Sequence, residues 1–226
     1  MAICSCVTCV IYDMDGLLLD TEPFYTQASE QIAARYGKVF DWSVKSRMIG
    51  QRAADSARVF TEALDMPITP EEYLAARQAV LDELFPKAEP MPGAVRLTEH
   101  LHRRGVTQAV ATSSDRRHFA LKTSRHQRWF SIFDCIVIGD DPGVQHGKPA
   151  PDIFLLAAER LGIAPAGCLV FEDSPVGVEA ARAAGMPVVA IADPHLKPEV
   201  FQAASQILGN LNEFDPAAWG LPPFQD

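Results

Sequence analysis

Two carboxylates, Asp13 and Asp15, stand directly after an apolar run and directly before Gly16, in the segment VIYDMDGLLLDTE (10–22). Like charges two residues apart repel each other, and burying carboxylates is costly unless a cation or hydrogen bonds compensate. A plain core strand would gain nothing from such a pair. We therefore expect a compensating charge at this point of the chain, and Gly16 would let the backbone turn closely around it.

Polar groups also follow three later apolar runs. They are Thr112, Ser113 and Ser114, then Lys148 in the loop 139–151, then Glu172 and Asp173. Ligand sites in open α/β sheets lie beyond the carboxyl ends of the strands, so we expect these groups to meet. Four carboxylates, hydroxyls beside backbone N–H donors and one lysine suit a divalent hard cation held next to a bound phosphate.

Each of these signals also has an ordinary structural explanation. An Asp-x-Asp-Gly stretch is usually a turn, and ATSSD (111–115) and FEDSP (171–175) could simply cap helices. A lysine in a loop is normally solvated. The coincidence of all four signals at the ends of successive expected strands favours the joint interpretation.

The elements that must position these residues alternate between strand and helix. Short apolar runs rich in β-branched residues predict parallel strands at 7–12, 107–111, 135–138, 168–171 and 187–191. Helical patterns between them cover 94–104, 116–124, 152–161 and 176–184, and three of these end at a glycine. The alternation predicts an α/β fold, a Rossmann-like doubly wound parallel sheet.

The stretch after the first strand has a different pattern. It shows helical segments near 23–36, 43–49, 54–64 and 70–84 and no convincing strand. Thr69 is a typical N-cap, and Pro70 occupies the first helical position. We therefore predict a catalytic core made of residues 1–20 and 88–226, with an inserted α-helical cap domain at 21–87.

Composition limits the partners and the compartment. With 20 basic and 29 acidic side chains the 226-residue chain carries a net charge of −9, which argues against nucleic-acid and membrane-surface binding. No apolar run approaches a membrane span, and the start lacks a basic n-region. The five cysteines are odd in number, and CSCVTC (4–9) lacks a partner Cys/His pair for a metal. We expect a cytoplasmic monomer.

Four motifs in order, DMDGLLLDTE, VATSS, GKPAPD and VFEDSPVGVEAARAAGM, resemble the haloacid dehalogenase superfamily of Mg²⁺-dependent phosphohydrolases. The helical insert resembles the cap of its β-phosphoglucomutase-like branch. Further segments, MPGAVRLTEHL, LKTSRHQRWF, GDDPGVQHGKPAPDIF and WGLPPF, are similar to the pseudouridine-5'-phosphatase group in particular. The resemblance thus covers nearly the whole chain.

The resemblance implies roles for the residues already singled out. Asp13 would be the nucleophile that takes the phosphoryl group, and Asp15 the general acid and base. Mg²⁺ would be bound by Asp13, by the backbone carbonyl of Asp15, and by Glu172 and Asp173. The phosphoryl oxygens would be held by Thr112, the N–H of Ser113 and Lys148. The implied substrate is a small phosphate ester, with pseudouridine 5'-phosphate first and other nucleotide and sugar phosphates behind it.

Three further residues are candidates for substrate contacts. Gln51 and Arg52 lie in a turn of the cap that the resemblance orients toward the site, although Arg52 could equally solvate a helix start. His146 precedes Lys148 and is a candidate near the phosphate, and its competing interpretation is a histidine that shapes the turn.

Two other functions remain open from the sequence. A sugar-phosphate mutase is one, although Tyr25 and Ala53 stand where the mutases of this branch have a histidine and an arginine. A noncatalytic binding or regulatory module on the same fold is the other, and the intact set of Asp13, Asp15, Lys148 and Asp173 argues against it. Haloacid dehalogenation is disfavoured because those relatives lack the second aspartate.

Overall fold

The computed structural model describes residues 7–48, 53–193 and 196–225. The chain forms two compact units, which we call the core unit (residues 1–20 and 89–226) and the helical unit (residues 21–88). The predicted limits of the cap, 21 and 87, lie within one residue of this division. No helix among the described residues has the length and apolarity needed to cross a membrane.

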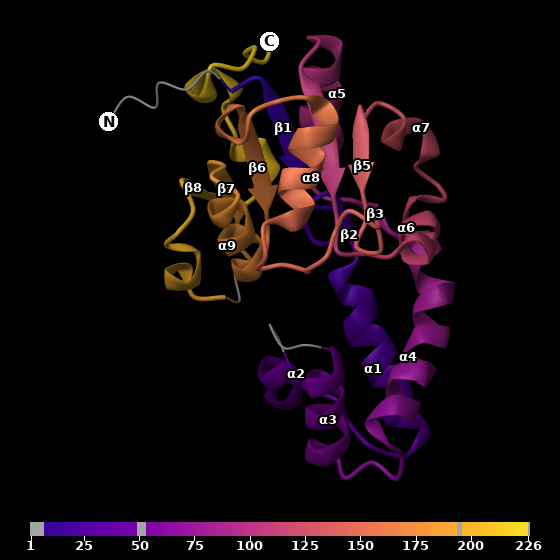
Figure 1. Cartoon of the computed structure of the whole chain (residues 1–226). Helices are drawn as coiled ribbons and strands as arrows, with labels where there is room; N and C mark the ends of the chain where they lie inside the picture. Colours follow the sequence, from indigo (N-terminus) through magenta and orange to yellow (C-terminus); the bar gives the residue numbers. More distant parts are fainter. Residues whose placement is uncertain (1–6, 49–52, 194–195, 226) are drawn as a thin grey trace. The chain divides into compact units, whose positions relative to one another are not determined.

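The core unit is built on a six-stranded parallel sheet with the strand order β5-β4-β1-β6-β7-β8 (Figure 1). Its strands are β1 (Cys9–Tyr12), β4 (Thr107–Ala111), β5 (Cys135–Val137), β6 (Cys168–Glu172), β7 (Val188–Ile191) and β8 (Gln206–Leu208). The five strands expected from the sequence are confirmed. The pattern does not predict β8, because its three residues make too short an apolar run and begin with a polar side chain.

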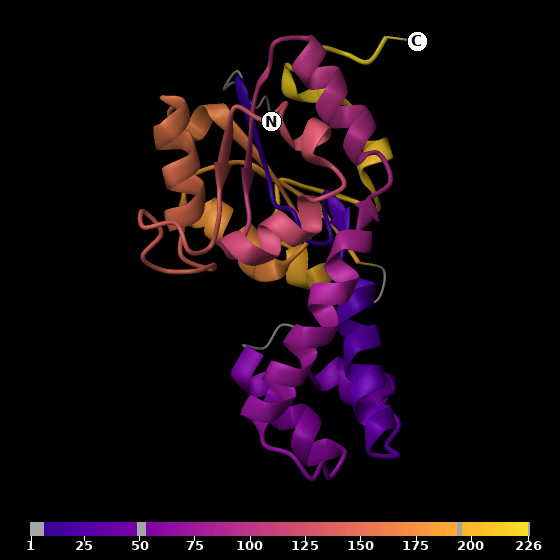
Figure 2. The same ribbon diagram turned by 90° about the vertical axis from the view of Figure 1, so that its right-hand side faces the viewer.

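Helices cover both faces of this sheet, as Figures 1 and 2 show. On one face, α8 (Asp152–Leu161) and α9 (Pro175–Ala183) enclose a buried cluster that includes Ile11, Phe154 and Val170. On the other face lies α5 (Ala94–Arg103). Burial on both sides explains why the strands are apolar throughout.

Shorter elements complete the core unit. After β4 come α6 (Arg116–Thr123) and α7 (Gln127–Phe130). Single 3₁₀ turns lie at Pro165–Gly167, Pro198–Phe201, Leu211–Glu213 and Pro216–Trp219. A two-residue antiparallel ladder, β2 (Leu19–Asp20) with β3 (Glu89–Pro90), joins the points where the chain leaves and re-enters this unit.

Strand register sets the position of the polar residues. Tyr12 at the end of β1 pairs with Val110 of β4 and with Phe171 of β6. The following residues of these strands are therefore level with one another at the carboxyl edge, and the N–H of Asp13 donates to the carbonyl of Phe171 at 3.0 Å. Gly16 then adopts a φ of +73°, a left-handed conformation that favours glycine, and turns the chain back toward Leu19.

The helical unit consists of α1 (Glu22–Arg35), α2 (Trp42–Met48), α3 (Ala53–Ala63) and α4 (Pro70–Leu84), followed by a 3₁₀ turn at Phe85–Lys87. Its core includes Phe60 and Tyr73, whose rings stack with centroids 4.0 Å apart. The N-cap predicted at Thr69 is confirmed, and the structure adds a full capping box: Thr69 accepts from the N–H of Glu72, whose carboxylate accepts from the N–H of Thr69.

Candidate active site

The carboxyl edge of the sheet brings Asp13 and Glu172 to one buried lysine. Lys148 Nζ donates to Asp13 Oδ1 at 2.5 Å, to Glu172 Oε1 at 2.6 Å and to the carbonyl of Ala111 at 3.3 Å. The Lys148 side chain is 6% exposed, and Glu172 is fully buried. The sequence placed these residues at successive strand ends, and the tertiary structure joins them through direct ion pairs.

Glu172 also organises the loop that follows β6. Its Oε2 accepts hydrogen bonds from the N–H of Asp173 at 3.1 Å and from the N–H and hydroxyl of Ser174. Ser174 in turn caps α9 by accepting from the N–H of Gly177. A Cβ at Gly177 would overlap the carboxylate of Glu172, so glycine is required where the first turn of α9 meets this side chain. Gly177 is not among the residues predicted from the sequence.

Burial dominates the electrostatics of this cluster. It raises the pKa of Asp13 to about 7, since desolvation together with Glu172 and Asp15 outweighs the attraction of Lys148. Burial also opposes the charge on Lys148, but Asp13 and Glu172 outweigh it and raise the pKa of the ammonium above its ordinary value. Lys148 therefore stays charged, and a single ammonium only partly offsets the buried carboxylates.

The same residues fit a divalent cation. Asp13, Glu172 and Asp173 each offer a carboxylate oxygen, and these atoms lie within 4.8 Å of one another. Hard oxygen donors are the ligands that Mg²⁺ prefers, and a cation would offset the negative charge that three carboxylates gather around the Lys148 ammonium.

Asp15 belongs to a separate set of contacts. Its Oδ1 accepts from Lys122 Nζ at 2.6 Å, and its Oδ2 accepts from Ser114 Oγ at 2.8 Å and from Thr112 Oγ1 at 3.5 Å. Lys122 also donates to Ser114 Oγ at 2.8 Å. Lys122 is not among the residues predicted from the sequence, because it lies within α6 and not at a strand end, and no local pattern marks it.

The remaining predicted residues differ in their surroundings. Ser113 is exposed, and its carbonyl packs so closely on Gly139 that a Cβ there would overlap it. His146 is also exposed, and its backbone N–H and ring both pair with Asp152 at the start of α8. This geometry favours the turn-shaping interpretation of His146. Gln51 and Arg52 lie outside the described residues.

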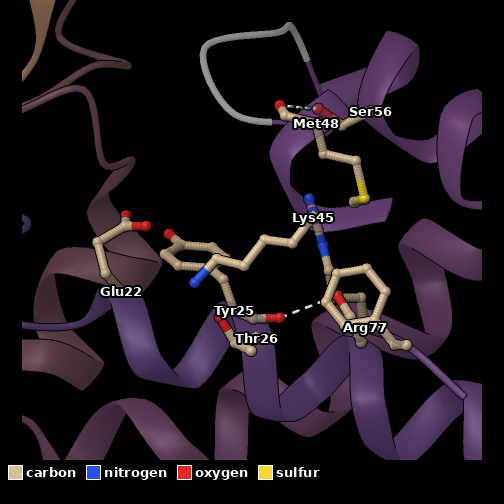
Figure 3. Close-up of a pocket in the computed structure, with 9 residues that line it drawn as sticks. Glu22, Tyr25, Thr26, Lys45, Met48, Ser56 and Arg77 are labelled. Atoms are coloured by element: carbon tan, nitrogen blue, oxygen red, sulfur yellow. Dashed lines mark hydrogen bonds between the residues drawn. The ribbon is translucent and has the colours of Figure 1, made fainter. Parts of the chain in front are cut away.

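The helical unit contains a pocket of its own, with a volume of about 220 Å³. Tyr25 of α1, Lys45 of α2 and Arg77 of α4 line it, as Figure 3 shows. The other described lining residues are Glu22, Thr26, Ser29, Phe40, Met48 and Ser56. The buried hydroxyl of Thr26 has no hydrogen-bond partner within the described structure. Two cations, hydroxyls and an aromatic ring suit a polar ligand that carries hydroxyl or anionic groups.

Comparison with known proteins shows which family the chain matches. Residues 7–185 match the family model described as haloacid dehalogenase-like hydrolase. The chain is 49% identical to (DL)-glycerol-3-phosphatase 2 of Arabidopsis thaliana, over 97% of this chain and 94% of the relative. It is 46% identical to a probable pseudouridine-5'-phosphatase of Drosophila melanogaster, over 97% of this chain and 96% of the relative.

Among solved structures, a hydrolase of the same family from Deinococcus radiodurans, with bound phosphate and sodium, has a TM-score of 0.81. It is 25% identical in sequence, and the match covers 97% of this chain and 99% of that one. The likeness therefore extends over both units of the chain.

Proposed function

The chain belongs to the haloacid dehalogenase-like hydrolase family, and from that premise we propose that it is a Mg²⁺-dependent phosphomonoester hydrolase with Asp13 as its nucleophile. It is a phosphatase of this family, and its substrates are small phosphate esters. The observation that carries the proposal is the buried Asp13 carboxylate held by Lys148, with Asp15 two residues farther along. A carboxylate beside a fixed positive charge suits attack on a phosphate ester.

The first step forms an aspartyl-phosphate. An oxygen of Asp13 attacks phosphorus, and the P–O bond to the leaving alcohol breaks with its electron pair on the leaving oxygen. Asp15, as the carboxylic acid, gives that oxygen its proton, so the products are the free alcohol and phosphorylated Asp13. Lys148 supplies positive charge next to the attacked phosphoryl group.

The second step restores the enzyme. Water attacks the phosphorus, the Asp15 carboxylate takes a proton from the water, and the P–O bond to Asp13 breaks. Orthophosphate leaves, and both aspartates regain their starting protonation states. Mg²⁺, when bound by Asp13, Glu172, Asp173 and the backbone carbonyl of Asp15, would neutralise charge on the phosphoryl oxygens.

The proposed function is tested by the ratio of the two products, orthophosphate and alcohol. Incubation with pseudouridine 5'-phosphate, glycerol 3-phosphate, fructose 1-phosphate and p-nitrophenyl phosphate should release orthophosphate and alcohol in equal amounts from at least one of them. Formation of a sugar bisphosphate with little free phosphate would indicate the mutase instead. Binding of the esters without any product would indicate a noncatalytic module.

We propose pseudouridine 5'-phosphate and glycerol phosphate as the first substrates to examine. Two relatives of nearly equal similarity carry these names, at 46% and 49% identity. The substrates share the phosphate and differ in the group attached to it, so the residues that bind this group must make the selection.

We also propose a cytoplasmic location, because the cysteines of the central sheet are free thiols. Cys9, Cys135 and Cys168 all lie in strands of the central sheet, where they act as small core residues. Cys9 and Cys168 are buried and Cys135 is half-buried, and free thiols in a chain with an odd number of cysteines fit a reducing compartment.

Lys148→Ala is expected to lower kcat/KM for every phosphate ester by about 10²–10³-fold, as loss of one preorganised electrostatic group does. Its ammonium forms ion pairs with both Asp13 and Glu172, so alanine would leave two buried carboxylates facing each other. Lys148→Arg keeps the charge and should lose less. Thermal melting separates a folding defect from lost catalysis, and the exposed Lys197→Ala is the control. Parental activity in both Lys148 variants would make Lys148 dispensable.

Arg77→Met and Lys45→Met are expected to change substrate preference. We propose that the pocket of the helical unit discriminates among phosphate esters, because it groups both cations with hydroxyls and the ring of Tyr25. The kcat/KM for the best hydroxylated ester should fall about tenfold or more, the value of one lost charged hydrogen bond. The p-nitrophenyl ester, which lacks hydroxyls, should change less than about twofold by the same reasoning.

The matched control for these variants is Arg58→Met. Arg58 lies on α3 with a side chain 60% exposed and pairs with Asp55, away from the pocket lining. It should leave both substrates unaffected. Equal losses on all esters in the Arg77 and Lys45 variants would contradict a role in discrimination.

A further inference from the structure

We propose that Lys122 is a positioning residue that holds the carboxylate of Asp15 in its working orientation for proton transfer. The inference rests on the proposed function, in which Asp15 gives and takes the proton, and it extends that function to a side chain outside the strand ends. Lys122 acts through Asp15, whereas Lys148 donates to the nucleophile Asp13.

The geometry fixes both oxygens of Asp15. Lys122 holds Oδ1 at 2.6 Å, while Ser114 holds Oδ2 at 2.8 Å. Lys122 and Ser114 are themselves joined at 2.8 Å, which closes a ring of three groups. A carboxylate held at both oxygens has its plane and its side-chain torsions defined, as an acid–base group needs for a proton transfer of fixed direction.

The burial of Lys122 makes a purely structural role a poor explanation. Lys122 is 1% exposed, although lysine is among the residues least often buried. An ammonium without water is tolerated only where charge and hydrogen bonds compensate it. An apolar side chain in this position of α6 would pack without that cost, so the lysine is explained by its partner, Asp15.

The contact between Lys122 and Asp15 depends on the positions of the sheet and of the helix α6. Asp15 follows β1, Ser114 follows β4, and Lys122 lies near the end of α6. Asp115 caps the start of α6 by accepting from the N–H of His118, which fixes the helix relative to the β4 loop. Lys148 serves the other carboxylate, Asp13. The core unit thus assigns one buried lysine to the nucleophile and another to the acid–base group.

The test separates the two chemical steps in the full-length Lys122→Met variant. p-Nitrophenolate leaves as a stable anion, so the first step with p-nitrophenyl phosphate requires little proton donation, whereas the second step still needs Asp15 to take a proton from water. We expect a burst of about one equivalent of nitrophenolate per site at near-parental rate, followed by turnover slowed about tenfold or more. With glycerol 3-phosphate, an alkyl ester, the first step should slow as well.

Two further variants, Thr123→Val and Asp15→Asn, test whether the effect of Lys122→Met is specific to its contact with Asp15. Thr123→Val removes a neighbouring buried hydroxyl of α6, which donates to the carbonyl of Phe119, and should keep parental kinetics in both steps. Asp15→Asn should show a larger defect than Lys122→Met, and the double variant should be no slower than Asp15→Asn alone, because a positioning residue has no effect once its target is gone.

Three results would overturn the inference. The first is parental turnover of both esters by Lys122→Met. The second is a burst whose amplitude falls in proportion to steady-state turnover, since this indicates fewer folded sites. The third is a double variant slowed further by the full factor of Lys122→Met. If Asp13→Asn kept its activity, the proposed nucleophile would be wrong, and that separate result would overturn the inference together with the function.

Discussion

The Asp13→Asn variant is expected to fold like the parent and to lose turnover by about 10⁴-fold or more, the order of loss when a nucleophile is removed. A carboxamide is a very poor nucleophile, so the aspartyl-phosphate cannot form. The fold should survive because Lys148 keeps its ion pair with Glu172 and asparagine fills nearly the same volume. The melting temperature should stay within about 4 °C of the parent's, the shift that ~1 kcal/mol produces in a chain of this size.

Release of orthophosphate from p-nitrophenyl phosphate measures this variant, and acid quenching after incubation with labelled substrate measures the phosphoenzyme. The parent should retain label on protein and Asp13→Asn should retain none. Asp20→Asn, an exposed carboxylate in the same segment, is the matched control and should behave as the parent does. A near-parental kcat in Asp13→Asn would show that the nucleophile lies elsewhere.

Removal of divalent metal is expected to abolish turnover, and excess Mg²⁺ to restore it. Asp13, Glu172 and Asp173 gather three carboxylates at one point, and a phosphate dianion bound there would add two further negative charges. Burial already raises the pKa of Asp13 to about 7 with Lys148 in place. A cation is therefore needed before a second anion can bind.

A binding measurement gives a readout independent of activity. Mg²⁺ should raise the melting temperature of the parent, because a ligand that binds only the folded state stabilises it. Asp173→Asn should weaken this shift, while Glu179→Gln, which replaces an exposed carboxylate on α9, should leave it unchanged. Full turnover in excess EDTA would contradict the metal assignment.

Local patterns in the sequence predicted most of the scaffold and placed polar residues at the ends of its strands. Apolar runs predicted five strands of the central sheet, and an N-cap residue followed by proline predicted the start of α4 at Thr69. Since parallel strands align their carboxyl ends, the order of elements alone indicated that Asp13, Lys148 and Glu172 would meet. These inferences succeed because hydrophobic periodicity and helix capping depend on residues close together in the chain.

Only the tertiary structure assigned partners to the buried charges. Lys122 and Asp15 are 107 residues apart, and no local pattern shows that this lysine of α6 is buried. The packing of helices and loops on the sheet also decides that Lys148 pairs with Asp13 while Lys122 pairs with Asp15. The same packing brings residue 177 against Glu172, so that only glycine fits there. The order of strands and helices along the chain can be inferred from local pattern. The direction and burial of a helical side chain depend on contacts between residues far apart in the sequence.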